Sequence, residues 1–226
     1  MIKAVIFDLD DTLISERAYI ESGFRYISKF LSMKIGISED EVSELLIRLF
    51  NDSPKHVFNR LLDDMGIQYT SDDILELVDL FRSHKPTIEF FHDVLPCLEE
   101  LKNRGIKLGI ITDGYAISQR QKLLALNADM YFDEIILTDN LGREYWKPHP
   151  KAFEIISEKM NVLFQHMIYV GDNPAKDFYI REVYPVQTVR IMRSSAIYRE
   201  TPYYKGVSEL FRIDSLNDLI SILIKR

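Results

Sequence analysis

Short, continuous apolar runs recur along the chain and predict strands that are buried on both faces. The first run, Ile2 to Leu9, ends in a group of carboxylates. Similar runs cover 107–112, 134–138, 166–171 and 187–191. Apolar runs of about four to eight residues are typical of strands in a parallel sheet, because helices cover both faces of such a sheet. We therefore expect these runs to pair as parallel strands.

Helical patterns lie between the runs. Segments 93–104 and 150–161 repeat apolar residues every three or four positions, and 215–225 has the same pattern. Alternation of strands and helices from residue 93 onward predicts an α/β fold, a doubly wound parallel sheet with right-handed crossovers. We expect 215–225 to close the fold as an amphipathic helix.

Residues 15–85 break this alternation and carry only helical patterns. The segment 39–50 has an apolar stripe, and Ser38 with Glu41 predicts a capping box at its start. Three further helices are expected at 17–33, 54–65 and 72–83. The sequence therefore predicts an α/β core formed by 1–14 and 93–226, with an all-helical insertion over 15–92.

The composition narrows the class of protein. The chain has 226 residues, 46% of them apolar and 28% charged, which is typical of a globular protein. Its net charge of −7 argues against binding to a nucleic acid polymer. The single cysteine, Cys97, excludes an internal disulfide, and we expect it to be buried.

No apolar stretch approaches the ~18 residues of a membrane span. Asp8 interrupts the apolar N-terminus too early for a secretory signal, so we expect a cytoplasmic monomer or homodimer without membrane partners.

Polar residues follow several of the predicted strands. They are Asp8, Asp10, Asp11, Thr112, Asp113, Lys147, Asp172 and Asp177. Because ligands bind at the carboxyl ends of strands in open α/β sheets, we expect these groups to gather at one edge. Clustered carboxylates repel one another unless a cation is present, and hard oxygen ligands suit Mg²⁺. A hydroxyl and an ammonium beside that ion suit a phosphoryl group. We expect Asp11 to face solvent or to accept hydrogen bonds in a local turn.

In these motifs the chain resembles phosphohydrolases of the haloacid dehalogenase (HAD) superfamily. Asp8-Leu9-Asp10-Asp11-Thr12 matches the first motif, DxDxT, and Thr112 and Lys147 match the second and third. The segment from Gly171 to Asp177 matches the fourth, GDxxxxD. The helical insertion resembles the cap that this superfamily places between its first and second motifs. The resemblance covers essentially the whole chain, and it implies a HAD-like, Rossmannoid core.

The resemblance also implies roles for these residues. Asp8 would be the nucleophile, and Asp10 the acid that protonates the leaving oxygen and then the base that activates water. Mg²⁺ would be held by the Asp8 carboxylate, the Asp10 backbone carbonyl and Asp172, with Asp177 supporting it directly or through water. Thr112, Lys147 and the Asp113 backbone would bind the phosphate. Because haloacid dehalogenases lack the second aspartate, Asp10 favours hydrolysis of phosphate esters.

The sequence thus predicts a Mg²⁺-dependent phosphatase that acts on a small phosphorylated metabolite through a phospho-aspartyl intermediate at Asp8. A phosphosugar, a nucleotide or a small acid remains open as the substrate. We expect substrate choice to depend on polar residues of the inserted helices, with Arg17, Tyr19, Arg25, Lys55, His56 and Arg60 as candidates. The alternatives are a phosphosugar mutase of the same superfamily and a non-catalytic binding module on the same fold. A signalling receiver domain is disfavoured, because it has a different motif order and no helical insertion.

Overall fold

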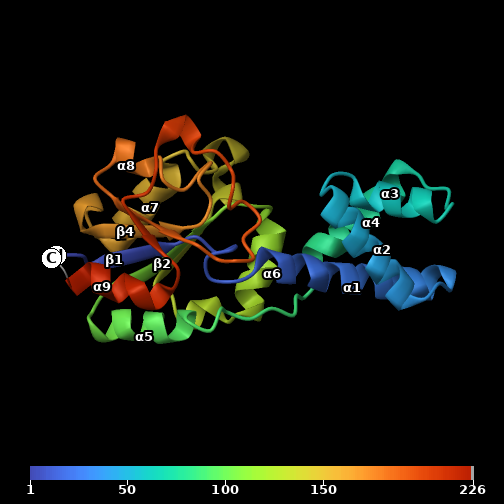
Figure 1. Cartoon of the computed structure of the whole chain (residues 1–226), viewed down its shortest axis with the longest axis horizontal. Helices are drawn as coiled ribbons and strands as arrows, with labels where there is room; N and C mark the ends of the chain where they lie inside the picture. The colour runs from blue at the N-terminus through green and yellow to red at the C-terminus, as the bar shows by residue number, and fades with distance from the viewer. Residues whose placement is uncertain (225–226) are drawn as a thin grey trace. The chain divides into compact units, whose positions relative to one another are not determined.

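The chain folds into two compact units, which are described separately. A computed structural model describes residues 1–224 (Figure 1). The α/β unit comprises Met1–Arg17 and the chain from Ile88 onward, and the helical unit comprises Ala18–Thr87.

A parallel sheet forms the centre of the α/β unit. Within the described residues its six strands lie in the order β3-β2-β1-β4-β5-β6, and every neighbouring pair is parallel. The strands are β1 (Ala4–Phe7), β2 (Lys107–Thr112), β3 (Glu134–Leu137), β4 (Met167–Gly171), β5 (Gln187–Ile191) and β6 (Phe211–Ile213). The doubly wound parallel sheet is therefore confirmed. Strand β6 is an addition that the sequence pattern did not predict.

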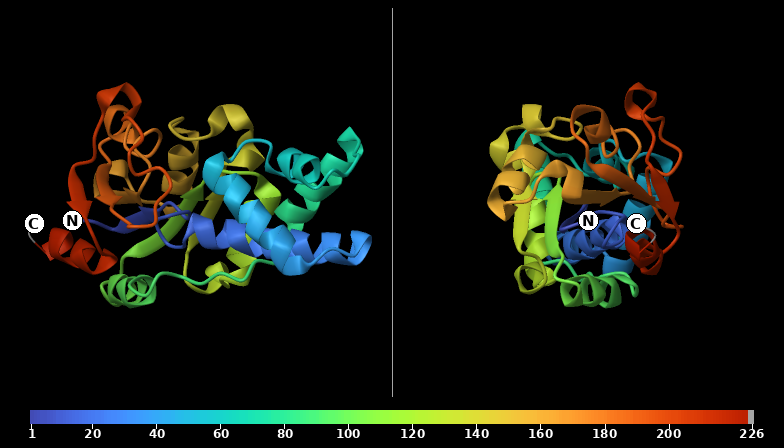
Figure 2. Two further views of the ribbon diagram at one scale, coloured as in Figure 1. Left: turned by 45° about the vertical axis from the view of Figure 1, so that its right-hand side comes forward. Right: turned by 90° about the vertical axis from the view of Figure 1, so that its left-hand side faces the viewer.

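Helices cover both faces of this sheet (Figures 1 and 2). They are α5 (Val94–Asn103), α6 (Ala116–Ala125), α7 (Lys151–Met160), α8 (Ile180–Val183) and α9 (Leu219–Ile224). Short 3₁₀ turns are η1 (Ala128–Met130), η2 (Thr138–Leu141), η3 (Arg143–Tyr145), η4 (Phe164–His166), η5 (Tyr204–Gly206) and η6 (Leu216–Asp218). The helix expected over 215–225 forms as η6 followed by α9, and residue 225 lies outside the described residues.

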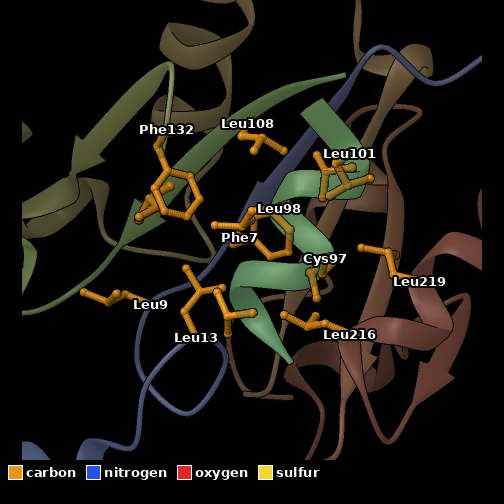
Figure 3. Close-up of a cluster of buried hydrophobic side chains, with 14 of the residues drawn as sticks. Phe7, Leu9, Leu13, Cys97, Leu98, Leu101, Leu108, Phe132, Leu216 and Leu219 are labelled. Atoms are coloured by element: carbon orange, nitrogen blue, oxygen red, sulfur yellow. The ribbon is translucent and has the colours of Figure 1, made fainter. Parts of the chain in front are cut away.

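Alternate residues of each strand point to opposite faces and build two cores. Val5 and Phe7 join a cluster with α5, α6 and α9 (Figure 3), whereas Ala4 and Ile6 join a cluster with α7 and α8. Cys97 lies in the first cluster, where burial raises the pKa of its thiol to about 12. The structural role expected for this cysteine is thus confirmed.

Four helices make up the inserted segment. They are α1 (Glu16–Ile35), which begins in the α/β unit, α2 (Glu39–Asp52), α3 (Val57–Asp64) and α4 (Ser71–Ser83). Their apolar faces meet in a core that contains Phe24, Ile27, Leu46, Leu61 and Leu77. No helix of residues 1–224 is both long enough and apolar enough to cross a membrane.

The capping box expected at Ser38 is wrong, and a different residue makes one. Ser38 precedes α2, but its side chain makes no capping hydrogen bond. Thr70 accepts from the Asp73 N–H at 3.3 Å, and its own N–H donates to the Asp73 carboxylate at 2.8 Å. Thr70 has the extended backbone that is typical of an N-cap (φ −103°, ψ 171°), whereas Ser38 has φ −59° and ψ 130°.

Two linkers join the units: the first leads out of the α/β unit before Ala18, and the second leads back into it from Ile88. They are paired with each other inside the α/β unit. Ile14 of the first linker forms an antiparallel bridge with Phe90 of the second. The Phe91 N–H donates to the Leu13 carbonyl at 2.9 Å. The chain therefore leaves the α/β unit and returns to it at adjacent positions.

A buried ion pair fixes these linkers to the core. The Arg193 guanidinium donates to the Asp93 carboxylate at 2.8 Å and to the Thr12 carbonyl at 2.9 Å, and it stacks 4.3 Å from the centre of the Phe91 ring. Asp93 also accepts from the Ser215 hydroxyl at 2.9 Å. One arginine thus contacts both linkers.

Candidate active site

The carboxyl ends of three neighbouring strands bring the polar residues together. Asp8 follows β1 directly, Thr112 ends β2, and Asp172 follows β4. The strand order changes direction at β1: β2 and β3 follow on one side of it, and β4, β5 and β6 follow on the other. This is the position at which open α/β sheets bind their ligands.

Three aspartates form a buried acidic cluster at this edge. Ligand oxygens of Asp8, Asp172 and Asp177 all lie within 4.8 Å of one another. Burial raises the pKa of Asp8 to about 6, although the Lys147 ammonium opposes the increase. Burial and the neighbouring carboxylates also raise the pKa of Asp172 well above its usual range. Among the described residues no donor reaches the buried Oδ2 of Asp172. An unsatisfied carboxylate oxygen in such a cluster fits a hard cation such as Mg²⁺.

Lys147 provides the positive charge behind this cluster. Its side chain is 0% exposed, and Nζ donates to Asp8 Oδ1 at 2.6 Å, to Asp177 Oδ1 at 2.8 Å and to the Tyr169 hydroxyl at 2.8 Å. Burial alone would lower the pKa of Lys147, but the Asp177 and Asp8 carboxylates hold it well above the usual value. Lys147 therefore stays protonated beside Asp8.

Asp177 is held more tightly than the other two aspartates. Its Oδ1 accepts from Lys147 and, at 3.1 Å, from Tyr169, and its Oδ2 accepts from the Asn173 N–H at 2.9 Å. Burial alone would raise its pKa, but Lys147 and Lys176 hold it below the usual value. Gly171 leaves room for this carboxylate, because a Cβ there would lie 2.5 Å from Asp177 Oδ2.

Thr112 and Asp113 order the loop after β2. The Thr112 hydroxyl accepts from Gln119 Nε2 at 2.5 Å. The Asp113 carboxylate accepts from the Thr138 hydroxyl at 2.7 Å and from the Lys147 N–H at 3.1 Å. Asp113 therefore connects this loop to the segment that carries the buried lysine.

The two aspartates that follow Leu9 have different surroundings. Asp10 faces the cavity, and its side chain is 17% exposed. Asp11 is 1% exposed, has a left-handed backbone (φ 51°), and accepts from the Glu16 and Ile197 N–H groups at 3.0 and 2.8 Å. Of the two expectations for Asp11, the local turn acceptor is confirmed and exposure to solvent is wrong. Buried turn N–H groups need an acceptor, and Asp11 provides it.

A cavity of about 340 Å³ within the α/β unit is lined by four aspartates, Asp8, Asp10, Asp113 and Asp172. The lining also includes Trp146 and Tyr198, and it includes three residues for which the sequence predicted no role: Glu16, Tyr115 and Lys176. Burial raises the pKa of Glu16 to about 7. Lys176 Nζ lies 3.4 Å from Asp113 Oδ2. Its place inside the fourth motif, between Asp172 and Asp177, was the signal in the sequence that could have identified it.

The candidates on the inserted helices are spread over different environments. Arg17 is partly exposed, and Arg25 is exposed on α1. Tyr19 is 5% exposed within the helical unit, where its ring packs 5.7 Å from Phe81 and 5.2 Å from His84, measured between ring centres. Arg60 ties α3 to the end of α2 through the Asp52 carboxylate.

Comparisons with known proteins agree with this geometry. A family model described as haloacid dehalogenase-like hydrolase matches residues 5–180. A glyceraldehyde 3-phosphate phosphatase of Methanocaldococcus jannaschii is 28% identical over 99% of this chain and 97% of its own length. Pyrophosphatase PpaX of Oceanobacillus iheyensis is 27% identical over 98% of this chain and 97% of its own.

A solved structure extends the likeness to three dimensions. The crystal structure of a HAD phosphatase from Thermococcus onnurineus superimposes with a TM-score of 0.62 and 27% identity, over 98% of each chain. The match of the family model covers well over half of the sequence, including the strand ends that form the acidic cluster. The chain therefore belongs to the haloacid dehalogenase-like hydrolase family, as one of its phosphohydrolases.

Proposed function

We propose that this protein is a Mg²⁺-dependent phosphatase of small phosphorylated metabolites, with a phospho-aspartyl intermediate at Asp8. The observation that carries the proposal is the contact between the Asp8 carboxylate and the fully buried Lys147 ammonium at 2.6 Å, beside the unpartnered Asp172 Oδ2. Such a site offers a nucleophile, a fixed positive charge and oxygen ligands for a cation at one point.

The chemistry follows from the residues. One oxygen of Asp8 would attack phosphorus while the bond to the leaving oxygen breaks, and Asp10 would protonate that oxygen. Water would then attack the phospho-aspartate, Asp10 would take its proton, and phosphate and Asp8 would be released. Lys147, Thr112 and the Asp113 backbone would bind the phosphoryl oxygens and stabilise their charge in the transition state.

The Asp8 and Asp172 carboxylates and the Asp10 carbonyl would hold Mg²⁺, and bound Mg²⁺ would neutralise the phosphate charge. Asp177 would support the ion directly or through water. Its oxygens already accept from Lys147, Tyr169 and Asn173, so its contribution includes fixing Lys147 against Asp8.

The relatives guide the choice of substrate. Two relatives are named for phosphatase activity on glyceraldehyde 3-phosphate and on pyrophosphate, which are both small and share a phosphoryl group. The cavity of about 340 Å³ is in the size range of small-molecule sites. We propose short phosphosugars as the first class to test, with pyrophosphate, nucleotides and small phosphorylated acids beside them.

The test is phosphate release from this panel with and without Mg²⁺, for the wild-type protein and Asp8→Asn. We expect Mg²⁺-dependent release that the variant lacks. Equal release by the variant would refute Asp8 as the nucleophile. Isomerisation of a phosphosugar without release of phosphate would indicate the mutase instead, and binding without either reaction would indicate a non-catalytic module.

A further inference from the structure

Two polar side chains of α6 are buried against the α/β unit. Gln119 is 2% exposed and Lys122 is 3% exposed. Residues three positions apart lie on one face of a helix, so both point the same way. A lysine is rarely buried unless it is paired, and the position of its partner therefore indicates its role.

Both side chains hold the same carboxylate. Lys122 Nζ donates to Asp10 Oδ1 at 2.7 Å, and Gln119 Nε2 donates to Asp10 Oδ2 at 2.9 Å. Gln119 Nε2 also reaches the Thr112 hydroxyl at 2.5 Å. Each oxygen of Asp10 thus has its own donor from α6, and the glutamine connects the ends of β1 and β2.

The backbone before α6 is shaped to admit this glutamine. Gly114 has φ +126°, and a Cβ there would lie 3.1 Å from the Gln119 side-chain amide carbon. A residue with a side chain would therefore be strained at this position and would press on Gln119. Gly114 and Asp10 also line the cavity. Both donors therefore contact a residue of the cavity wall, Asp10, and Gln119 also lies against Gly114.

The orientation of Asp10 matters most in the second half of the proposed reaction, and this inference rests on the proposed function. In that half a water oxygen bonds to phosphorus, the bond from Asp8 to phosphorus breaks, and the water proton moves to Asp10. Asp10 lines the cavity, and each of its oxygens keeps acceptor capacity beyond the hydrogen bond from α6. We infer that Gln119 and Lys122 are positioning residues that aim Asp10 at the attacking water.

Kinetics with p-nitrophenyl phosphate can separate this role from a merely structural one. Its leaving group departs without a proton from the enzyme, so kcat/KM reports the attack by Asp8. The value of kcat includes the later hydrolysis of the phospho-aspartate. A loss of positioning should therefore lower kcat more than kcat/KM.

The experiment compares Lys122→Met and Gln119→Met with the wild-type protein in the presence of Mg²⁺. Misplacing a catalytic group can cost roughly 100-fold, so we expect kcat to fall by roughly 10- to 100-fold while kcat/KM falls much less. Rapid mixing should show an initial burst of p-nitrophenol close to one per active site in the variants. Lys151→Met is the matched control, because Lys151 on α7 has a side chain that is 46% exposed.

The possible failures are distinguishable. A wild-type protein that hydrolyses no phosphate ester overturns the proposed function and this inference with it. An active wild type whose Lys122→Met and Gln119→Met forms lose kcat and kcat/KM equally, or lose neither, overturns only the positioning role. If Lys122→Met does not fold, as judged by circular dichroism, Gln119→Met decides the matter, because it retains the buried ion pair.

Discussion

Replacing the proposed nucleophile should stabilise the metal-free protein near neutral pH. The pKa of Asp8 is raised from 3.8 to about 6, mainly by burial. When folding raises the pKa of a carboxyl, the protonated group stabilises the folded state. This stabilisation is complete below the pKa of the unfolded state, and it is lost as the pH rises through the pKa of the folded state. The loss therefore occurs between about pH 4 and pH 7. Asparagine resembles the neutral form of Asp8, so the Asp8→Asn variant should not show this loss of stability.

The size of the effect follows from the two pKa values. A tenfold change in a protonation equilibrium is worth about 1.4 kcal/mol, so ionised Asp8 lowers the free energy of unfolding by roughly 3 kcal/mol at about pH 8. Asp8→Asn should be more stable than wild type by that amount in EDTA, and by much less at about pH 4. Added Mg²⁺ should reduce the difference in the free energy of unfolding between the variant and the wild type, because a bound cation favours the ionised carboxylate.

Urea unfolding followed by circular dichroism measures these differences, with Asp129→Asn at an exposed position as the control. A variant that is less stable than wild type in EDTA at about pH 8 would refute the reasoning. That result would show that the 2.6 Å contact with Lys147 stabilises ionised Asp8 more than burial destabilises it.

Four further outcomes test other parts of the structure. Arg193→Met should lower the free energy of unfolding by about 3–5 kcal/mol, because it leaves Asp93 buried without its charged partner; a loss below about 1 kcal/mol in urea unfolding would contradict this. Gly171→Ala should cost about 1–3 kcal/mol in thermal unfolding, since its Cβ would press on Asp177, and an unchanged melting temperature would show that the carboxylate can move. Trp146, the single tryptophan, lines the cavity, so its fluorescence should change when vanadate and Mg²⁺ are added; the change should be absent in Asp172→Ala. Cys97 is 1% exposed with a thiol pKa of about 12, so a thiol reagent should label it only in urea, and rapid labelling of the native protein would contradict its burial.

The sheet could be predicted because its strands are continuous apolar runs. Strand β6 escaped prediction because Phe211-Arg212-Ile213 is short and carries a charge. Helix α6 was not predicted because Gln119 and Lys122 occupy buried positions that are apolar in an ordinary amphipathic helix. Tertiary hydrogen bonds replace apolar packing there, and no periodicity reveals them.

The strand-end residues of the site could be located from the sequence because parallel strands end at one edge. Their roles in the reaction stay predictions. Tyr169 could not be identified, because within an apolar strand its ring is indistinguishable from a core residue, and only the structure shows its hydroxyl between Lys147 and Asp177. Lone motifs also mislead at helix ends, as the contrast between Ser38 and Thr70 shows.

The pairing of the two linkers has a consequence for how such a chain can be recombined. Because Ile14 and Phe90 are bridge partners, any segment spliced between them needs only to start and finish at adjacent points. Its length and sequence are then independent of the strand register. Residues 18–87 should be replaceable by a short turn, or by the corresponding segment of a relative, with the sheet and its acidic cluster preserved. Recombination could in this way replace the inserted helices without changing the residues at the carboxyl ends of the strands.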